Sequence, residues 1–189
     1  LALVWEARGA LRPDLQVVVM SATLDADPVA ALLDDAPVII SEGRAFPVET
    51  RWLPRPAGPR LEPAIAQLIE QALSETEGGM LVFLPGEGEI RRVEALLRHL
   101  PVALRPLFGA MDFAAQRAAI GPAPGRKVVL ATSIAETSLT IPDIRVVVDA
   151  GRARRLRFDP ASGMARLVTE RVSRAEAERM MDYMAALPA

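Results

Sequence analysis

Residues 127–149, KVVLATSIAETSLTIPDIRVVVD, decide the fold of this chain. Residues 127–131 and 145–149 are short and β-branched, which is typical of parallel strands that are buried on both faces. The loop between them is rich in hydroxyl side chains and carries one acid: Thr132, Ser133, Glu136, Thr137, Ser138 and Thr140. In parallel sheets, ligands bind beyond the carboxyl ends of the strands. The stretch therefore predicts an α/β protein with a ligand site at this loop.

The composition indicates a soluble globular protein. Of the 189 residues, 51% are hydrophobic and 24% are charged, and no apolar run approaches the roughly 18 residues that a membrane span needs. There is no cysteine and a single histidine, His99, which excludes disulfides, cysteine nucleophiles and multi-histidine metal sites. The first residues lack the features of a secretory signal peptide. We therefore expect no membrane partner and a cytoplasmic location.

Charge is distributed unevenly along the chain. The net charge of −2 argues against a globally basic nucleic-acid binder. However, residues 1–42 contain two arginines and seven acidic residues, whereas residues 144–174 contain eight arginines and three acidic residues. The usual explanation of an arginine run is a solvated surface. A local basic strip on a nearly neutral protein also fits a surface that binds phosphates.

The hydrophobic pattern predicts alternating strands and helices. Strands are expected at 15–20, 38–40, 48–53, 80–84, 102–107, 127–131 and 145–149. Helices are expected at 1–10, 25–33, 61–73, 89–100 and 112–120. Residues 156–158 and 168–172 are expected to pair as a hairpin around the turn sequence at 159–163. Alternation from residue 49 onward predicts right-handed crossovers and a parallel sheet.

Three loops carry residue types suited to phosphate binding: residues 21–23 (SAT), 85–88 (PGEG) and 132–140. Hydroxyls and free backbone N–H groups at a strand-to-helix junction can donate hydrogen bonds to a phosphate without adding bulk. For any one loop alone, helix capping is the simpler explanation. Thr132, for example, precedes the acid Glu136 in a sequence that resembles a capping box.

In combination, these loops resemble the DEAH/RHA group of superfamily 2 helicases, most closely its bacterial HrpB-type members. MSATLD (20–25) resembles motif III, EGRAFPVE (42–49) the junction between two RecA-like domains, GMLVFLPGEGEI (79–90) motif IV, and residues 104–151 the segment that runs into motif V. The resemblance extends from residue 10 to about residue 178. It implies an α/β, RecA-like parallel sheet with helices on both faces. The implied domains are the end of a first RecA-like domain (1–42), a linker (43–48), most of a second RecA-like domain (49–179) and an unassigned tail (180–189).

The resemblance also implies a function, namely an ATP-driven motor that moves along single-stranded RNA or DNA and uses ATP and Mg²⁺ in the complete protein. Ser21, Ala22 and Thr23 would couple the nucleotide and nucleic-acid sites. Ser138, Thr140 and Asp143 would contact the nucleotide, although a solvent-facing turn explains Asp143 equally well. Contact with nucleic acid is implied for Gly86, Thr132, Ser133, Thr137, Arg152, Arg154 and Arg155. Near Ile120, relatives often have an aromatic residue that stacks on the base.

Three motifs of the family are absent from the sequence. There is no G-x-x-x-x-G-K-[ST] loop and no DEAH tetrapeptide, and SRAEAER (173–179) runs into MMDY rather than into the arginines of motif VI. These groups stabilise the transferred phosphate, so this stretch by itself is expected to be inactive in ATP hydrolysis. The alternative is a RecA-like module that serves protein contacts without catalysis. A small-molecule kinase is disfavoured, because SAT and motif V have no role in one.

Overall fold

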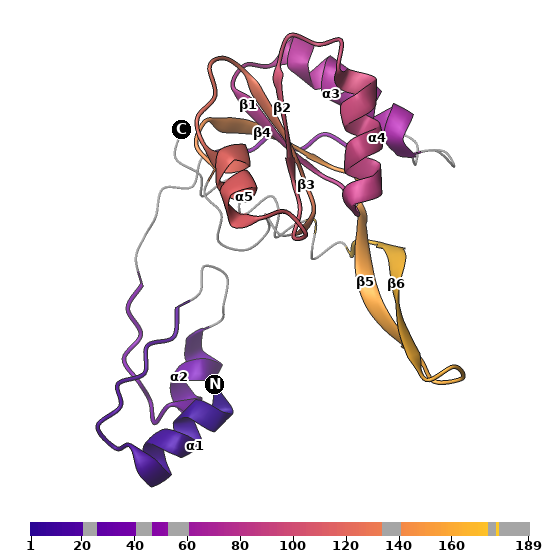
Figure 1. Cartoon of the computed structure of the whole chain (residues 1–189). Helices are drawn as coiled ribbons and strands as arrows, with labels where there is room; N and C mark the ends of the chain where they lie inside the picture. Colours follow the sequence, from indigo (N-terminus) through magenta and orange to yellow (C-terminus); the bar gives the residue numbers. More distant parts are fainter. Residues whose placement is uncertain (21–25, 41–46, 53–60, 134–140, 174–176, 178–189) are drawn as a thin grey trace. The chain divides into compact units, whose positions relative to one another are not determined.

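The computed structural model describes residues 1–20, 26–40, 47–52, 61–133, 141–173 and 177. By its internal contacts the chain divides into two compact units, residues 1–43 and 44–189 (Figure 1). The assignment of these units to two successive RecA-like domains, with motif III in the first, stays a prediction. Among the described residues, no helix combines the length and the apolar character that crossing a membrane requires.

The first unit contains two helices, α1 (Ala2–Leu11) and α2 (Ala26–Leu32). The prediction of buried strands at 15–20 and 38–40 is wrong for this structure, because neither segment is in a sheet and Met20 and Ile39 are largely exposed. A strand exists only by hydrogen bonding to a neighbour, and no partner strand occurs among the described residues of this unit. The edge strand predicted from residue 48 is likewise not formed over the described residues 47–52.

The second unit is built on a four-stranded parallel sheet, as predicted. Its strands are β1 (Gly79–Phe83), β2 (Ala103–Leu107), β3 (Lys127–Ala131) and β4 (Ile144–Asp149), in the order β2-β3-β1-β4. The two central strands, β1 and β3, are buried along their whole length. Their continuous apolar sequences are explained by this burial on both faces.

Helices cover both faces of the sheet, which confirms the predicted architecture. Helices α3 (Leu61–Glu75) and α4 (Glu87–Leu97) pack on one face, and α5 (Phe113–Ile120) packs on the other (Figure 1). Alternate residues of β1 point to opposite sides: Val82 joins the core under α3 and α4, whereas Leu81 joins the core under α5. Asp112 starts α5 by accepting a hydrogen bond from the Ala115 backbone N–H at 2.8 Å.

The sheet is followed by an antiparallel hairpin of β5 (Arg152–Asp159) and β6 (Met164–Arg171). The hairpin projects away from the sheet (Figure 1). The sequence predicted its turn, but it predicted shorter strands. Gly151 begins it with φ of +64°, a left-handed conformation that favours glycine. The Gly151 N–H donates to the Asp149 carboxylate at 2.7 Å, which fixes the direction in which the hairpin leaves β4.

Candidate nucleic-acid and nucleotide sites

The loops predicted to contact nucleic acid lie together at the carboxyl edge of the sheet. The loop after β1 is joined to the end of β3 by the Leu84 N–H to Ala131 carbonyl bond of 2.8 Å. The Ala150 N–H after β4 donates to the Phe83 carbonyl at 3.1 Å. Because β1, β3 and β4 are parallel neighbours, the residues that follow all three strands converge here.

A shallow pocket at this edge combines predicted residues from two of these loops. Ser133 comes from the loop after β3, and Arg152 and Arg154 come from the first residues of β5. Its remaining walls are formed by Phe83, Leu84, Pro85, Asp149, Ala153 and Val172. The pocket itself measures only about 10 Å³, which is room for about one water molecule. Its serine and arginine side chains donate hydrogen bonds, so the surface around its mouth suits an anion.

Gly86 lies directly against Arg154. A Cβ atom at Gly86 would come within 2.9 Å of the Arg154 Cζ and Nη1 atoms. The backbone of Gly86 is extended, with φ of −171°, so its conformation alone does not require glycine. The absence of a side chain at this position instead makes room for the guanidinium group.

Glu89 is part of this edge, although no sequence pattern marks it as a site residue. Its side chain is only 14% exposed, and its Oε1 atom accepts from Arg92 Nη2 at 2.8 Å and from Arg154 Nη2 at 3.3 Å. Glu89 belongs to the site because it bonds to Arg154, which is 65 positions away in sequence, and no local sequence pattern reveals such a contact.

The predicted residues at this edge are not all equivalent. Thr132 is half-buried, and its backbone N–H donates to the Leu107 carbonyl at 3.1 Å, at the end of β2. Arg155 follows Arg154 on β5, so the alternation of the strand directs it to the opposite face of the hairpin from Arg152 and Arg154. Arg155 therefore does not line the pocket.

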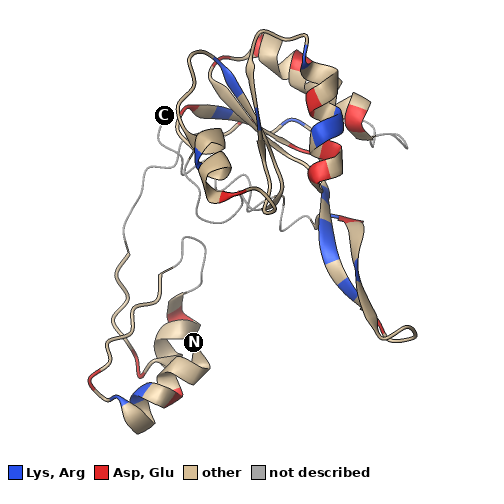
Figure 2. Cartoon of the chain, in the orientation of Figure 1, with Lys and Arg blue, Asp and Glu red and all other residues tan. Residues whose placement is uncertain are grey.

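Arginines also line the hairpin away from the pocket. Figure 2 shows Lys and Arg residues repeated along β5. Arg157 forms two bonds of 2.7 Å with the Glu170 carboxylate on β6. The Arg157 guanidinium lowers the pKa of Glu170 below its ordinary value. Part of the basic strip is thus paired within the hairpin itself.

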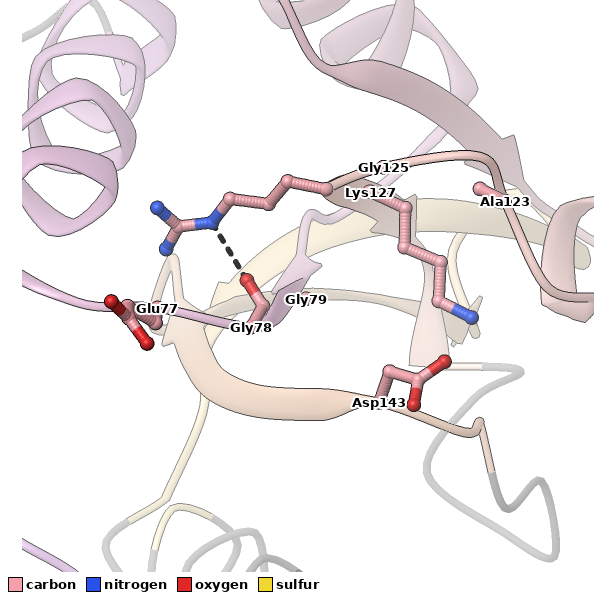
Figure 3. A pocket seen from close by; sticks show the side chains of 8 residues that line it. Glu77, Gly78, Gly79, Ala123, Gly125, Lys127 and Asp143 are labelled. Atoms are coloured by element: carbon pink, nitrogen blue, oxygen red, sulfur yellow. Dashed lines mark hydrogen bonds between the residues drawn. The ribbon is translucent and has the colours of Figure 1, made fainter.

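Asp143 lies at the opposite, amino edge of the sheet. Its backbone carbonyl accepts a 2.7 Å hydrogen bond from the Gly79 N–H, where β1 begins. Its φ of +66° is left-handed, a conformation that aspartate tolerates better than most residues. Asp143 lines a pocket of about 320 Å³ with Glu77, Gly78, Gly79, Ala123, Gly125, Arg126 and Lys127 (Figure 3).

Lys127 is a buried cation beside this pocket. It is 2% exposed, and its Nζ donates to the carbonyls of Ile120 and Gly121 at 3.3 and 3.2 Å, where α5 ends. Its ammonium group points toward the Asp143 carboxylate (Figure 3). Burial lowers the pKa of Lys127, and the charge of Asp143 partly opposes this shift. Lys127 thereby links the end of α5 to the start of β4.

The loop between β3 and β4 thus starts at one edge of the sheet and ends at the other. Ser133 and Asp143 are ten positions apart in sequence, yet they lie at opposite ends of β-strands of five or six residues. Five residues of strand span roughly 17 Å. Six predicted site residues, Ser21, Ala22, Thr23, Thr137, Ser138 and Thr140, lie outside the described residues. Among the residues that are described, no group of three or more acidic or histidine side chains could hold a metal ion.

Comparison with known proteins identifies the family. Residues 63–175 match the model of the helicase conserved C-terminal domain. The ATP-dependent RNA helicase HrpB of Escherichia coli (strain K12) is 52% identical over 180 residues, which are 93% of this chain and 22% of that protein. The pre-mRNA-splicing factor ATP-dependent RNA helicase prp22 of Schizosaccharomyces pombe (strain 972 / ATCC 24843) is 38% identical over 89% of this chain and 15% of that protein.

A solved structure agrees with these matches. The crystal structure of the Escherichia coli DEAH/RHA helicase HrpB superposes with a TM-score of 0.86 at 49% identity, over 98% of this chain and 24% of that one. The chain therefore spans only 22% of the length of HrpB and 15% of the length of prp22. It belongs to the family of the helicase conserved C-terminal domain, within the DEAH/RHA group of helicases, and it is similar there to HrpB.

Proposed function

We propose that this chain is the part of an ATP-dependent RNA helicase that contacts single-stranded nucleic acid and the nucleotide with opposite edges of one sheet. The observation that carries the proposal is the pocket that joins Ser133 to Arg152 and Arg154 at the carboxyl edge. The relatives are ATP-dependent RNA helicases by name, which supports RNA as the nucleic acid that is bound and ATP as the nucleotide that is hydrolysed.

The carboxyl edge has the chemistry of a phosphate site. Arg152 and Arg154 supply guanidinium groups that can donate two parallel bonds to a phosphate. The Ser133 and Thr132 hydroxyls add neutral donors. Gly86 is the N-cap of α4 and brings no capping side chain, so the backbone N–H groups of this helix end can donate to an anion. The carboxylates of Glu87 and Glu89 in the first turn offset the helix dipole. Phosphate contacts of this kind give affinity without reading sequence, as translocation along a strand requires.

The amino edge is the proposed nucleotide side. Asp143 can accept hydrogen bonds from ribose hydroxyls through its carboxylate. Lys127 donates to the carbonyl of Ile120, near which relatives often have an aromatic residue that stacks on the base. Mg²⁺ has no ligand set among the described residues, so its binding remains an expectation for the complete protein.

Coupling follows from the path of the chain between the edges. The stretch from Thr132 to Asp143 begins at the proposed nucleic-acid edge and ends at the proposed nucleotide edge. A change at either ligand can therefore bias the same segment, which is the requirement for coupling two sites. The chain has no Walker loop and no DEAH tetrapeptide, so we propose that ATP hydrolysis needs groups beyond it and that it is inactive alone. A cytoplasmic location is also proposed.

Filter binding of the full-length protein to single-stranded RNA tests the nucleic-acid edge. We expect Thr132→Ala and Arg154→Ala each to weaken binding, and Arg154→Ala to reduce the slope of log affinity against log salt by about 0.7, the value for one phosphate on a single strand. Arg98→Ala is the matched control, because Arg98 is exposed and lies at the other end of α4. Unchanged affinity and salt slope in both test variants would refute the site.

A module that serves only protein contacts is the second candidate. It is favoured by the apolar side chains that the hairpin exposes, since Leu156, Phe158 and Leu167 are each about two-thirds exposed. This candidate predicts a full-length protein that neither hydrolyses ATP nor binds single-stranded RNA. RNA-stimulated release of phosphate from ATP by the wild-type protein would exclude it.

A further inference from the structure

We propose that Glu89 and Gly86 are positioning residues that hold the guanidinium group of Arg154 ready for a phosphate. The inference rests on the proposed function, because it assumes that Arg154 contacts nucleic acid. It adds Glu89 to the site, and it gives Gly86 a role that acts through Arg154 in place of the direct nucleic-acid contact that the resemblance implies.

Glu89 restrains Arg154 from one side. It lies in the first turn of α4, and both of its carboxylate oxygens are 3.3 Å from Arg154 Nη2. The Oε2 atom is buried and has no hydrogen-bond partner among the described residues. A buried carboxylate without a compensating cation is costly. Glu89 therefore attracts the guanidinium and keeps it at the start of α4.

Glu89 is itself fixed by a second ion pair. Arg92 donates to Glu89 Oε1 at 2.8 Å and, through Nε, to Glu62 Oε1 on α3 at 2.6 Å. Hydrogen bonding to its own backbone N–H and to Arg92 lowers the pKa of Glu62. The chain of charges Glu62–Arg92–Glu89–Arg154 thus runs from α3 through α4 to β5. Because Glu89 has a second cationic partner, it does not have to follow Arg154 when a phosphate arrives.

Gly86 restrains Arg154 from the other side. The atoms of Arg154 nearest to the Gly86 position are Cζ, Nη1 and Nε, all at or within 3.0 Å of a Cβ built there. The guanidinium plane therefore rests against the backbone at the start of α4, where the pocket lies. Any side chain at residue 86 would push it away.

The consequence is a pre-organised phosphate contact. A free arginine loses much side-chain conformational entropy when it binds an anion, whereas Arg154 has already lost part of it in the folded protein. Only one of its nitrogens, Nη2, is directed at Glu89. Among the described residues, the other N–H groups have no hydrogen-bond partner, so they can donate to a phosphate that lies over the mouth of the pocket beside Ser133.

Two substitutions test the inference from the two sides. Glu89→Asp keeps the charge but shortens the side chain by one methylene, and Gly86→Ala displaces the guanidinium without straining an extended backbone. In the full-length protein, we expect each to weaken binding of single-stranded oligouridylate RNA by about three- to tenfold, in the range of couplings between contacting residues. The slope of log affinity against log salt should stay at the wild-type value, since Arg154 can still reach the phosphate.

The same two substitutions are then made in the Arg154→Ala background. If they act through Arg154, each should now change affinity by less than about twofold. Glu94→Asp is the matched control, because Glu94 also lies on α4 and pairs with Arg91 instead. It should leave the affinity unchanged. Thermal unfolding midpoints are measured for all variants to check that each one remains folded.

The outcomes separate the inference from the proposed function. If Arg154→Ala alone leaves RNA affinity and salt slope unchanged, the proposed function fails. If Arg154→Ala weakens binding but Glu89→Asp and Gly86→Ala are equally harmful with and without Arg154, or harmless in both, the positioning role is refuted and the phosphate contact stands.

Discussion

At the carboxyl edge of the sheet the polar groups are accessible, whereas at the amino edge the central charge is buried. Arg154 is 41% exposed on its side chain, but Lys127 is 2% exposed and donates to two backbone carbonyls. The first arrangement fits a ligand that arrives from solvent and slides, since exposed arginines can exchange one phosphate for the next. The second fits a fixed wall that shapes a pocket around Asp143.

The difference follows from how parallel strands end. The backbone N–H and carbonyl groups of the central strands β1 and β3 are used within the sheet, so the loops beyond these strands supply the ligand contacts. At the carboxyl edge these loops contain Ser133 and the start of the hairpin. At the amino edge they are short, and Gly79 allows the Asp143 carbonyl to approach closely.

The largest effect is expected from a change that damages both edges at once. Leu130 is fully buried in the central strand β3, so Leu130→Ala removes core volume that the sheet cannot refill. Such substitutions cost about 2–5 kcal/mol in the free energy of unfolding. Native-state hydrogen exchange should show lower protection of the β1 and β3 amides. Leu167→Ala, at an exposed hairpin position, should leave their protection intact.

A change at the amino edge should affect the nucleotide alone. Asp143→Gly removes the carboxylate and suits the left-handed backbone at this position. Loss of one hydrogen bond to a charged group costs about 1.5–3 kcal/mol, so we expect the KM for ATP to rise about tenfold or more. Steady-state ATPase assays of the full-length protein at saturating RNA measure it. An unchanged KM would assign Asp143 to the turn and not to the nucleotide.

Lys127 provides a smaller, pH-dependent test of the buried wall. Because burial lowers its folded-state pKa, the unfolded chain binds this proton up to a higher pH than the folded chain does. Stability should therefore rise as pH increases from the folded pKa toward the ordinary lysine value of about 10.4. Thermal midpoints of the wild type should show this rise relative to Lys127→Met, which lacks the proton. Parallel pH profiles for the two proteins would contradict the assignment.

The smallest effect is expected at the hairpin, away from both edges. Arg157→Ala removes the guanidinium that lowers the pKa of Glu170, so this pKa should rise toward its ordinary value. NMR titration of the Glu170 carboxyl carbon measures the change. The ATP KM should be unaffected, because the pair lies on the exposed hairpin. A lowered Glu170 pKa that persists in this variant would show that another group causes it.

The parallel sheet could be predicted from sequence because each of its strands is marked by a local run of apolar residues. Val128, Val129 and Leu130 form a continuous apolar run, and the residues around α4 and α5 have helical periodicity. The strands expected at 15–20 and 38–40 failed for a non-local reason, since strand formation depends on a partner. An apolar sequence alone does not supply one.

The site residues could be predicted from sequence, but the residues that they contact could not. Gly86, Ser133 and Arg154 belong to motifs that resemble a known family, so their convergence was expected. The partners of these residues were not, because the contacts of Arg154 with Glu89 and of Lys127 with Ile120 arise only from packing. The resemblance already implied that the first part of residues 132–143 contacts nucleic acid and the last part the nucleotide, but it did not place Ser133 and Asp143 at opposite edges of the sheet. The direction of the strands separates them.

One paired measurement tests whether the carboxyl edge binds RNA while the amino edge binds the nucleotide. The full-length protein, Arg154→Ala and Asp143→Gly are compared for affinity to single-stranded RNA without nucleotide and for KM of ATP at saturating RNA. We expect Arg154→Ala to weaken RNA affinity and to leave the ATP KM unchanged. We expect Asp143→Gly to raise the ATP KM and to leave RNA affinity unchanged. Equal losses of both properties in both variants would contradict both expectations.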